Sequence, residues 1–261
     1  MILAHGWAVA LTWVRWQVFE VEADLAQGLP GLTIIGLPDA ALSESRDRVR
    51  AAVVNSGEPW PQRRITLGLS PASLPKQGSS FDLSMAVAVL CAAGGLPARV
   101  ADRMVMFGEL GLDGRVRPIR GVLPAAMAAV EAGFSRMVVP RANAAEGVLV
   151  PGLEVWAVDS LRELLAALRQ GRPPEPATDV GAATAPAAGD SFEVDLADVL
   201  GQPTGRRAIE VAAAGAHHTF LLGDPGTGKT MLAARLPGVL PALDRVAALE
   251  VTAVHSVAGV L

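Results

Sequence analysis

Eight consecutive residues combine glycines, a lysine and a threonine at a spacing suited to phosphate chemistry. Glycines at such positions let successive backbone N–H groups turn toward phosphate oxygens, while the lysine reaches the β- and γ-phosphates and the threonine hydroxyl binds Mg²⁺. The pattern G-x-x-x-x-G-K-[ST] is that of a P-loop, and it predicts a site for a nucleoside triphosphate with Mg²⁺. The residues are Gly223, Asp224, Pro225, Gly226, Thr227, Gly228, Lys229 and Thr230, of which Thr230 is the expected Mg²⁺ ligand.

The residues on either side of this loop support the same interpretation. Residues 218–222 are a short apolar run typical of a buried strand, and residues 231–236 have the composition of a helix. A strand–loop–helix order places a bound anion at a helix N-terminus. The chain has two lysines, Lys76 and Lys229, so an accidental lysine in a glycine-rich turn is the less favoured explanation.

A P-loop ATPase also needs an acidic residue at the end of a second strand, which helps to hold Mg²⁺. Beyond Lys229 the acidic residues are Asp244 and Glu250, and both lie in residues 241–251, which read as a helix. No later arginine is placed to act as a finger. We therefore expect a truncated chain that binds a nucleoside triphosphate without hydrolysing it efficiently, and we assign no catalytic residue.

Length and composition predict two domains. The chain has 261 residues, of which 51% are hydrophobic, and a formal net charge of −4. Such a chain can bury a substantial core, and a charge this close to zero gives no general argument for binding nucleic acid. Its single cysteine, Cys91, excludes a disulfide framework and a thiol-based metal cluster, and its apolar surroundings predict a core position.

The apolar segments do not predict a membrane protein. The longest, residues 85–96, is too short to span a bilayer and contains two glycines. Residues 8–14 are apolar, but no basic residue precedes them and Arg15 ends them, which favours a first strand over a signal peptide. We expect a cytoplasmic protein without a membrane partner.

The order of the remaining elements predicts an α/β domain at residues 1–168. Residues 169–191 are rich in proline, alanine and glycine and lack apolar periodicity, so we expect a mobile linker before a second domain at residues 192–261. In the first domain, residues 112–114 read as a hairpin-like turn. Strands are expected at residues 16–21, 32–35, 64–69, 104–107, 137–139 and 154–158. Helices are expected at residues 40–55, 81–93, 122–131 and 161–168.

The first domain offers no complete catalytic set. His5 is its only histidine, which makes a Ser-His-Asp arrangement improbable. Ser79 or Ser80 could be a nucleophile at the start of a buried helix, but we favour a helix N-cap, supported by Asp82 in the first turn. Lys76 follows Pro75 on a loop where the sequence shows nothing that would lower its pKa.

Five segments, in order along the chain, carry a further signal: residues 28–41, 62–66, 74–83, 108–124 and 198–202. Together they resemble the YifB/ComM family of magnesium-chelatase-like AAA+ proteins. The resemblance implies a Lon-protease/ribosomal-S5-type domain followed by an AAA+ domain that binds ATP and Mg²⁺ and assembles as a homo-hexameric ring. In naturally transformable bacteria, members of the family are understood as DNA branch-migration helicases that act in recombination on single-stranded or branched DNA.

Two departures from related proteins limit what the resemblance implies. Ser80 falls where Lon peptidases have their serine, but residues 118–124 offer Leu123 or Pro124 in the region of the lysine. Without that amine nothing deprotonates the serine, so we expect a non-proteolytic scaffold. The family's Walker B acid, sensors and arginine finger would lie beyond Leu261, so only the P-loop residues are carried over. Residues 199–202 are either a wall of the adenine pocket or a turn that leads into a helix at residues 206–213.

Two functions stay open from the sequence. The first is a DNA-translocating ATPase, and the second is a chelatase-like ATPase that remodels a protein or metal-insertion partner. Phosphate contacts need clustered basic residues, and the densest group includes Arg46, Arg48 and Arg50. Glu44 and Asp47 interleave with these arginines, which favours an exposed, salt-bridged helix face over a DNA-binding surface.

Overall fold

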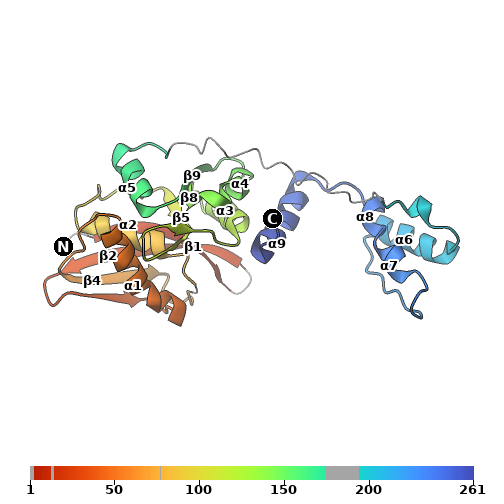
Figure 1. Ribbon diagram of the computed structural model, residues 1–261, viewed down its shortest axis with the longest axis horizontal. Coiled ribbons are helices and arrows are strands. Elements are labelled where there is room, and N and C mark those ends of the chain that lie inside the picture. The colour runs from red at the N-terminus through yellow and green to blue at the C-terminus, as the bar shows by residue number, and fades with distance from the viewer. Residues whose placement is uncertain (1–2, 13–14, 77, 175–193) are drawn as a thin grey trace. The chain divides into compact units, whose positions relative to one another are not determined.

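The computed structural model describes residues 3–12, 15–76, 78–174 and 194–261 (Figure 1). Within these residues, seven strands form one sheet in the order β3-β4-β2-β1-β5-β8-β9, and β6 pairs with β7 separately. The strands of the large sheet are β1 (Leu3–Thr12), β2 (Arg15–Ala26), β3 (Gly31–Ile35), β4 (Arg64–Ser70), β5 (Met104–Met106), β8 (Arg136–Pro140) and β9 (Glu154–Val158). The short pair consists of β6 (Glu109–Leu110) and β7 (Val116–Arg117).

The sheet is mixed, with parallel pairing at both ends. Strand β2 pairs antiparallel with β1 and with β4, whereas β3–β4, β1–β5, β5–β8 and β8–β9 are parallel. Along β2, Phe19, Val21 and Ala23 are buried and alternate with the half-buried Glu20 and Glu22. This period of two turns the apolar side chains of β2 toward one face of the sheet and the acidic ones toward the other.

Helices cover both faces of the sheet, which gives three layers. One face packs against α1 (Ala40–Asn55), α2 (Asp82–Ala92) and α5 (Leu161–Gln170). The other face packs against α3 (Val122–Glu131), α4 (Ala144–Val148) and the 3-10 turn η1 (Arg141–Asn143). Every residue of α2 is buried, so this helix lies at the centre of the first core.

The chain divides into two compact units. The first, here called the sheet unit, comprises residues 1–181 and 249–261, and the second, the P-loop unit, comprises residues 182–248. The P-loop unit contains η2 (Leu196–Asp198), α6 (Pro203–Gly215), α7 (Lys229–Ala233) and α8 (Leu236–Val239). Helix α9 (Arg245–Ala258) begins in the P-loop unit, and its residues from Leu249 onward belong to the sheet unit.

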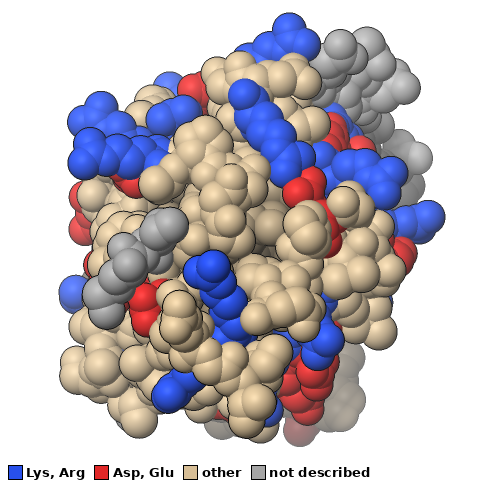
Figure 2. All heavy atoms as spheres, turned by 90° about the vertical axis from the view of Figure 1, so that its left-hand side faces the viewer, with Lys and Arg blue, Asp and Glu red and all other residues tan. Residues whose placement is uncertain are grey.

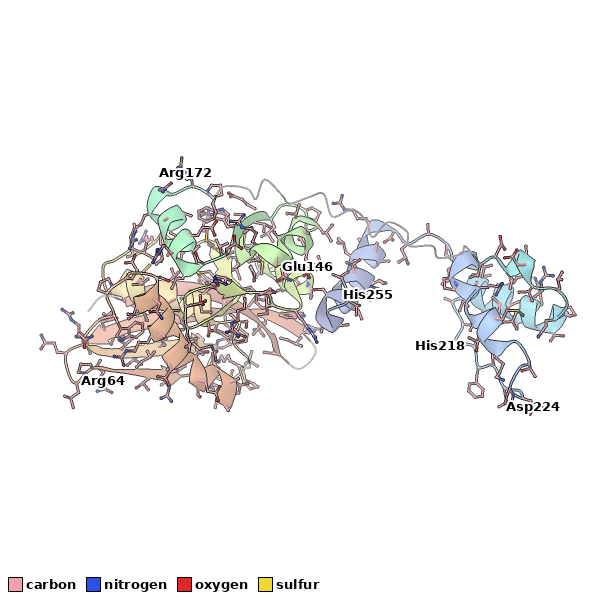
Figure 3. The ribbon with its side chains drawn as sticks, viewed as in Figure 1. Arg64, Glu146, Arg172, His218, Asp224 and His255 are labelled. Carbon is pink, nitrogen blue, oxygen red and sulfur yellow. The ribbon has the colours of Figure 1, made fainter. Side chains whose placement is uncertain are left out.

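The last part of α9 packs on the second core of the sheet unit. Leu249 and Ala253 contact that core, and the Gly121 N–H donates to the Ser256 carbonyl at 3.2 Å. The Ser256 hydroxyl donates to the Glu146 carboxylate, in the region where Figure 3 labels Glu146 and His255. These contacts join α9 to the α3–α4 side of the sheet.

The main elements of the sheet unit confirm the sequence predictions. The helices at residues 40–55 and 122–131 and the strand at residues 154–158 have the expected bounds. Local signals explain this agreement: the Asp39 side chain caps α1 by accepting from the Leu42 N–H at 2.7 Å, and the Gly171 C-cap of α5 is left-handed. Cys91 is buried as expected, and burial raises the pKa of its thiol to about 12.

Two predictions near the P-loop are wrong. Residues 218–222 form no strand, and Phe220 and Leu222 are 86% and 87% exposed. A strand needs a neighbouring strand for its backbone hydrogen bonds, and the described residues of the P-loop unit contain none. The helix expected at residues 231–236 is interrupted, because α7 ends at Ala233 and α8 begins at Leu236 with a proline in its first turn.

The proposed linker lies mainly outside the described residues. Its first two residues, 169 and 170, end α5, and residues 175–191 are not described. In the part of the chain that the structure describes, no helix combines the length and apolar character that a bilayer span requires.

Candidate nucleotide-binding site

The candidate loop connects an extended segment to α7 within the P-loop unit. Gly226 and Gly228 have φ angles of 82° and 83°, in the left-handed region that glycine adopts without strain. Gly228 is the N-cap of α7, so Lys229 and Thr230 occupy the first turn of that helix. Figure 3 labels Asp224 in this loop. The sequence therefore predicted correctly that the loop leads directly into a helix.

The Lys229 ammonium group folds back over its own loop. Its Nζ donates to the carbonyl oxygens of Gly223 and Asp224, each at 2.7 Å, and lies 3.3 Å from Thr227 Oγ1. These partners are neutral, so phosphate oxygens, which carry charge, would form stronger hydrogen bonds with the same ammonium. The lysine is thus held at the loop without a competing carboxylate.

The backbone of the loop offers donors that suit an anion. Among the described residues, the N–H groups of Gly226 and Gly228 have no hydrogen-bond partner. The Thr227 hydroxyl donates to the Asp224 carbonyl at 2.8 Å, which keeps the loop compact. The Thr227 N–H, between those of Gly226 and Gly228, donates to the Asp224 carbonyl at 3.3 Å. Unpaired N–H groups beside a helix start can donate to an anion, so the residues present fit a phosphate group.

Gln202 links the start of α6 to the loop. It is the N-cap of α6, with a φ of 53°, and its Nε2 donates to the Thr227 carbonyl at 2.7 Å. A Cβ at Gly228 would lie 2.8 Å from Gln202 Nε2, so this contact requires glycine. Residues 199–202 thus form the turn that leads into α6 and also contact the P-loop. The spacing of residues along the sequence does not indicate the contact between Gln202 and the P-loop.

The cavity beside Ser80 lies in the sheet unit and has about 630 Å³. Trp16, Asp39 and Arg120 line it together with Ser79 and Ser80, and no lysine or histidine is among the described residues around it. The Ser80 hydroxyl donates to the Val9 carbonyl at 3.3 Å, and the Ser79 hydroxyl donates to Glu109. The cavity lining therefore supplies neither a lysine nor a histidine to deprotonate Ser80.

The predicted serine N-cap of α2 is wrong. The N-cap is Phe81, without a side-chain capping bond, because both serine hydroxyls are engaged with other elements. Asp82 is fully buried and pairs with Arg48, with Nε to Oδ2 at 2.9 Å, and it also accepts from the Leu110 N–H at 3.1 Å. Burial raises the pKa of Asp82, and the hydrogen bond from Arg48 opposes that shift.

The expectation for Lys76 is also wrong. This side chain is fully buried, its Nζ donates to the Pro71 carbonyl, and it lies 5.4 Å from the centre of the Phe19 ring. Burial away from water lowers the pKa of the amine. Lys76 does not line the Ser80 cavity, so its buried amine is not placed as a base for that serine.

Of the arginines on the basic face of α1, Arg48 forms an ion pair, and its partner is one that the sequence did not indicate. Arg48 pairs with Asp82 of α2, and it also donates to Ser45 Oγ at 2.6 Å. The expected pairing with Glu44 or Asp47 is not among the ion pairs of the described residues. Figure 2 shows basic and acidic side chains interspersed over the face that it presents, so that face has no uniformly basic surface.

Two family models, both described by the magnesium-chelatase subunit ChlI, together match most of the chain. "Subunit ChlI of Mg-chelatase" matches residues 21–143, and "Magnesium chelatase, subunit ChlI" matches residues 195–261. The second match includes the candidate loop and Gln202. The first includes α1, α2 and most of the residues around the Ser80 cavity, Ser79 and Ser80 among them.

Similar proteins come from several bacteria. An uncharacterized protein of Mycobacterium tuberculosis is 52% identical over 261 residues, which are 100% of this chain and 51% of that protein. YifB of Escherichia coli is 41% identical over 239 residues, covering 90% and 46%. Competence protein ComM of Haemophilus influenzae is 36% identical over 256 residues, covering 98% and 50%. The chain spans about half the length of these relatives.

A partial likeness extends to a peptidase. Lon protease of Chloroflexus aurantiacus is 34% identical over 150 residues, which are 53% of this chain and 18% of the protease. The likeness agrees with the expected relation of the first domain to Lon, and the geometry around Ser80 shows that the lysine partner is missing from the cavity.

Proposed function

Because the chain belongs to the family of the magnesium-chelatase subunit ChlI, we propose that it binds ATP and Mg²⁺ through residues 223–230. The observation that carries this proposal is the Lys229 ammonium group, which three neutral oxygen atoms hold over the loop. Beside it, the N–H groups of Gly226 and Gly228 are free to donate to phosphate. Bound Mg²⁺ would neutralise phosphate charge, with Thr230 as its ligand from the chain.

The direct test is ATP binding by the Lys229→Ala variant. Charged hydrogen bonds contribute about 1.5–3 kcal/mol, so ATP affinity should fall roughly 10- to 100-fold. Glu210→Ala is a suitable control, because Glu210 is an exposed residue of α6 in the same unit whose recorded partner is Arg207. Equal ATP affinity of Lys229→Ala and the wild type, measured with a fluorescent ATP analogue, would contradict the proposed site.

We further propose that residues 192–261 belong to an AAA+ motor that assembles as a homo-hexamer and moves single-stranded or branched DNA. The support is the likeness to competence protein ComM, which covers 98% of this chain, together with the DNA-directed function that the resemblance to the YifB/ComM family implies. We place the motor in the cytoplasm. Stimulation of ATP hydrolysis by a four-way DNA junction, measured on a form that extends beyond Leu261, is the expected result.

A chelatase-like ATPase acting on a protein or metal-insertion partner is the second candidate, because both family descriptions name the magnesium-chelatase subunit. It predicts hydrolysis that is indifferent to DNA and depends on a protein partner. The same assay therefore separates the two functions: a junction that leaves the hydrolysis rate unchanged would favour the chelatase-like activity.

In this proposal, residues 1–168 serve as a non-proteolytic scaffold. The support is the Ser80 hydroxyl, which donates to a backbone carbonyl and lies in a cavity without an amine or imidazole base. Ser80→Ala should leave casein degradation at the background level of the wild type. A wild-type peptidase activity that the substitution removes would overturn the scaffold.

A further inference from the structure

Three side chains of the sheet unit converge outside the two sites described above. One potential ligand atom from each of His5, Glu20 and Glu22 lies within 4.8 Å of the others. The register of β1 and β2 places His5 directly opposite Glu22, and Glu20 lies two residues away on the same strand. Alternation along β2 turns both glutamates to the same face, so the convergence follows from strand pairing rather than from a loop.

Two of the three side chains, those of His5 and Glu20, already interact. His5 Nδ1 lies 2.7 Å from Glu20 Oε1, and the side chains of His5 and Glu20 are 35% and 30% exposed. The ligand atoms are therefore accessible from solvent, while their Cα positions are fixed by ten consecutive residue pairs between β1 and β2. A site on paired strands loses less conformational freedom on binding than a site on a loop.

The group carries more negative than positive charge. Its two carboxylates stand beside one imidazole, and among the described residues no lysine or arginine forms an ion pair with either glutamate. A dication would offset both carboxylate charges at short range, which a single imidazole cannot do.

A glycine lies beside Glu22 on the neighbouring strand β4. Gly68 of β4 is the register partner of Glu22, and a Cβ at Gly68 would lie 3.4 Å from Glu22 Oε2. With glycine at this position, the Glu22 carboxylate lies over a β4 residue that carries no side chain. Water could then complete the coordination of an ion held from β1 and β2.

We propose that His5, Glu20 and Glu22 bind a first-row transition-metal dication, with Zn²⁺ as the favoured ion. Imidazole nitrogen and carboxylate oxygen are both ligands that Zn²⁺ accepts, and three protein ligands leave a fourth position open to water. The ion takes the place of the proton between His5 Nδ1 and Glu20 and draws Glu22 into the same coordination sphere. It joins β1 to β2 and is independent of the nucleotide site.

The test is Zn²⁺ binding to the 261-residue chain without nucleotide, measured by competition with a chromophoric chelator. We expect one ion per chain. His5→Gln and Glu22→Gln should each weaken binding at least about tenfold, in line with the loss of one ligand. Asp24→Asn is the matched control, because Asp24 lies on the same strand two residues beyond Glu22 and outside the group.

Co²⁺ gives a second readout, because its visible absorption reports the ligands around it. The wild type and Asp24→Asn should show the same Co²⁺ spectrum, and His5→Gln should lose it while its near-ultraviolet circular dichroism stays that of a folded protein. Wild-type affinity in both His5→Gln and Glu22→Gln would overturn the site. An equal loss in Asp24→Asn would also overturn it, by showing diffuse attraction to acidic residues.

Discussion

The sheet unit and the P-loop unit differ in how far their large apolar side chains are buried. In the sheet unit, Phe19 and Phe81 are completely buried, whereas Phe220 and Leu222 of the P-loop unit are 86% and 87% exposed. The first unit contains the partners that its strands and helices require. The second has a small core of Leu196, Val199, Ile209 and Leu232, and its strand-like segment has no strand beside it among the described residues.

This difference separates local from long-range determinants of structure. Helix α6 forms within the P-loop unit because its hydrogen bonds are internal to the helix. Residues 218–222 have an equally clear apolar pattern, but their backbone needs a partner strand. An apolar run therefore predicts a strand only where the fold supplies a neighbour, and the following predictions test that conclusion.

The largest expected contrast is in backbone amide exchange. Amides of β4 lie between two paired strands and should exchange only through opening that costs several kcal/mol, whereas unpaired amides exchange almost freely. We expect β4 to exchange at least about a thousandfold more slowly than residues 219–222. Hydrogen–deuterium exchange followed by mass spectrometry measures both, and similar protection of residues 219–222 would reveal a strand partner.

Truncating one phenylalanine in each unit should change the unfolding free energy by amounts that differ by several kcal/mol. Phe81→Ala empties a fully buried position and should cost about 3–5 kcal/mol of unfolding free energy. Phe220→Ala removes an exposed ring and should change stability by less than about 0.5 kcal/mol. All five tryptophans precede residue 157, so urea unfolding followed by tryptophan fluorescence reports the first change. Urea unfolding followed by far-ultraviolet circular dichroism reports the second change. A large loss of stability in Phe220→Ala would mean that this ring is buried.

Removing an ion pair should also cost more stability in the sheet unit than in the P-loop unit. Asp82→Ala leaves Arg48 without its carboxylate and the buried Leu110 N–H without an acceptor, at a cost of about 3 kcal/mol. In the P-loop unit, Glu210→Ala breaks an exposed pair with Arg207 and should cost no more than about 0.5 kcal/mol. Equal unfolding midpoints of Asp82→Ala and the wild type in urea would show that the buried pair does not stabilise α1 against α2.

The smallest effect concerns a surface pair within the sheet unit. Arg169 donates two hydrogen bonds of 2.7 Å to Glu58, and these bonds lower the pKa of Glu58 from its usual 4.5. Arg169 is 42% exposed, so solvent screening limits the expected cost of Glu58→Gln to roughly 0.5–1 kcal/mol at pH 7.

The sign of the pH dependence follows from that lowered pKa. Above pH 4.5 Glu58 is ionised in both folded and unfolded chains and the pair contributes fully. As the pH falls below this value, the unfolded chain takes up the proton first and the contribution is lost. The stability difference between Glu58→Gln and the wild type should therefore shrink from pH 7 to pH 3. A difference that stays constant would exclude the ion pair as its source.

Much of the sheet unit could be predicted because its signals are local. Helix α1 follows the cap at Asp39 and repeats its buried positions at Leu42, Val49 and Val53, which is the period of a helix. The two-residue strands β6 and β7 were missed, because so short a pair has no periodicity. Only the turn between them, at residues 112–114, was visible in the sequence.

The sequence likewise predicts a candidate site only where its residues are close together in the chain. The P-loop is one contiguous motif, so its residues could be named from the sequence. Its contact with Gln202 and the burial of Lys76 depend on residues far apart in the chain. The group formed by His5, Glu20 and Glu22 could have been found by pairing the first two strands in register, which places His5 opposite Glu22.

The two lysines of the chain differ in their access to solvent, and this has a practical consequence. Lys76 is completely buried among apolar groups, whereas Lys229 lies at the surface of its loop. An amine-reactive reagent applied to the folded chain should therefore modify a single ε-amino group, in addition to the α-amine. Chemical labelling at that one position would then report directly whether the loop is occupied, without any engineered probe.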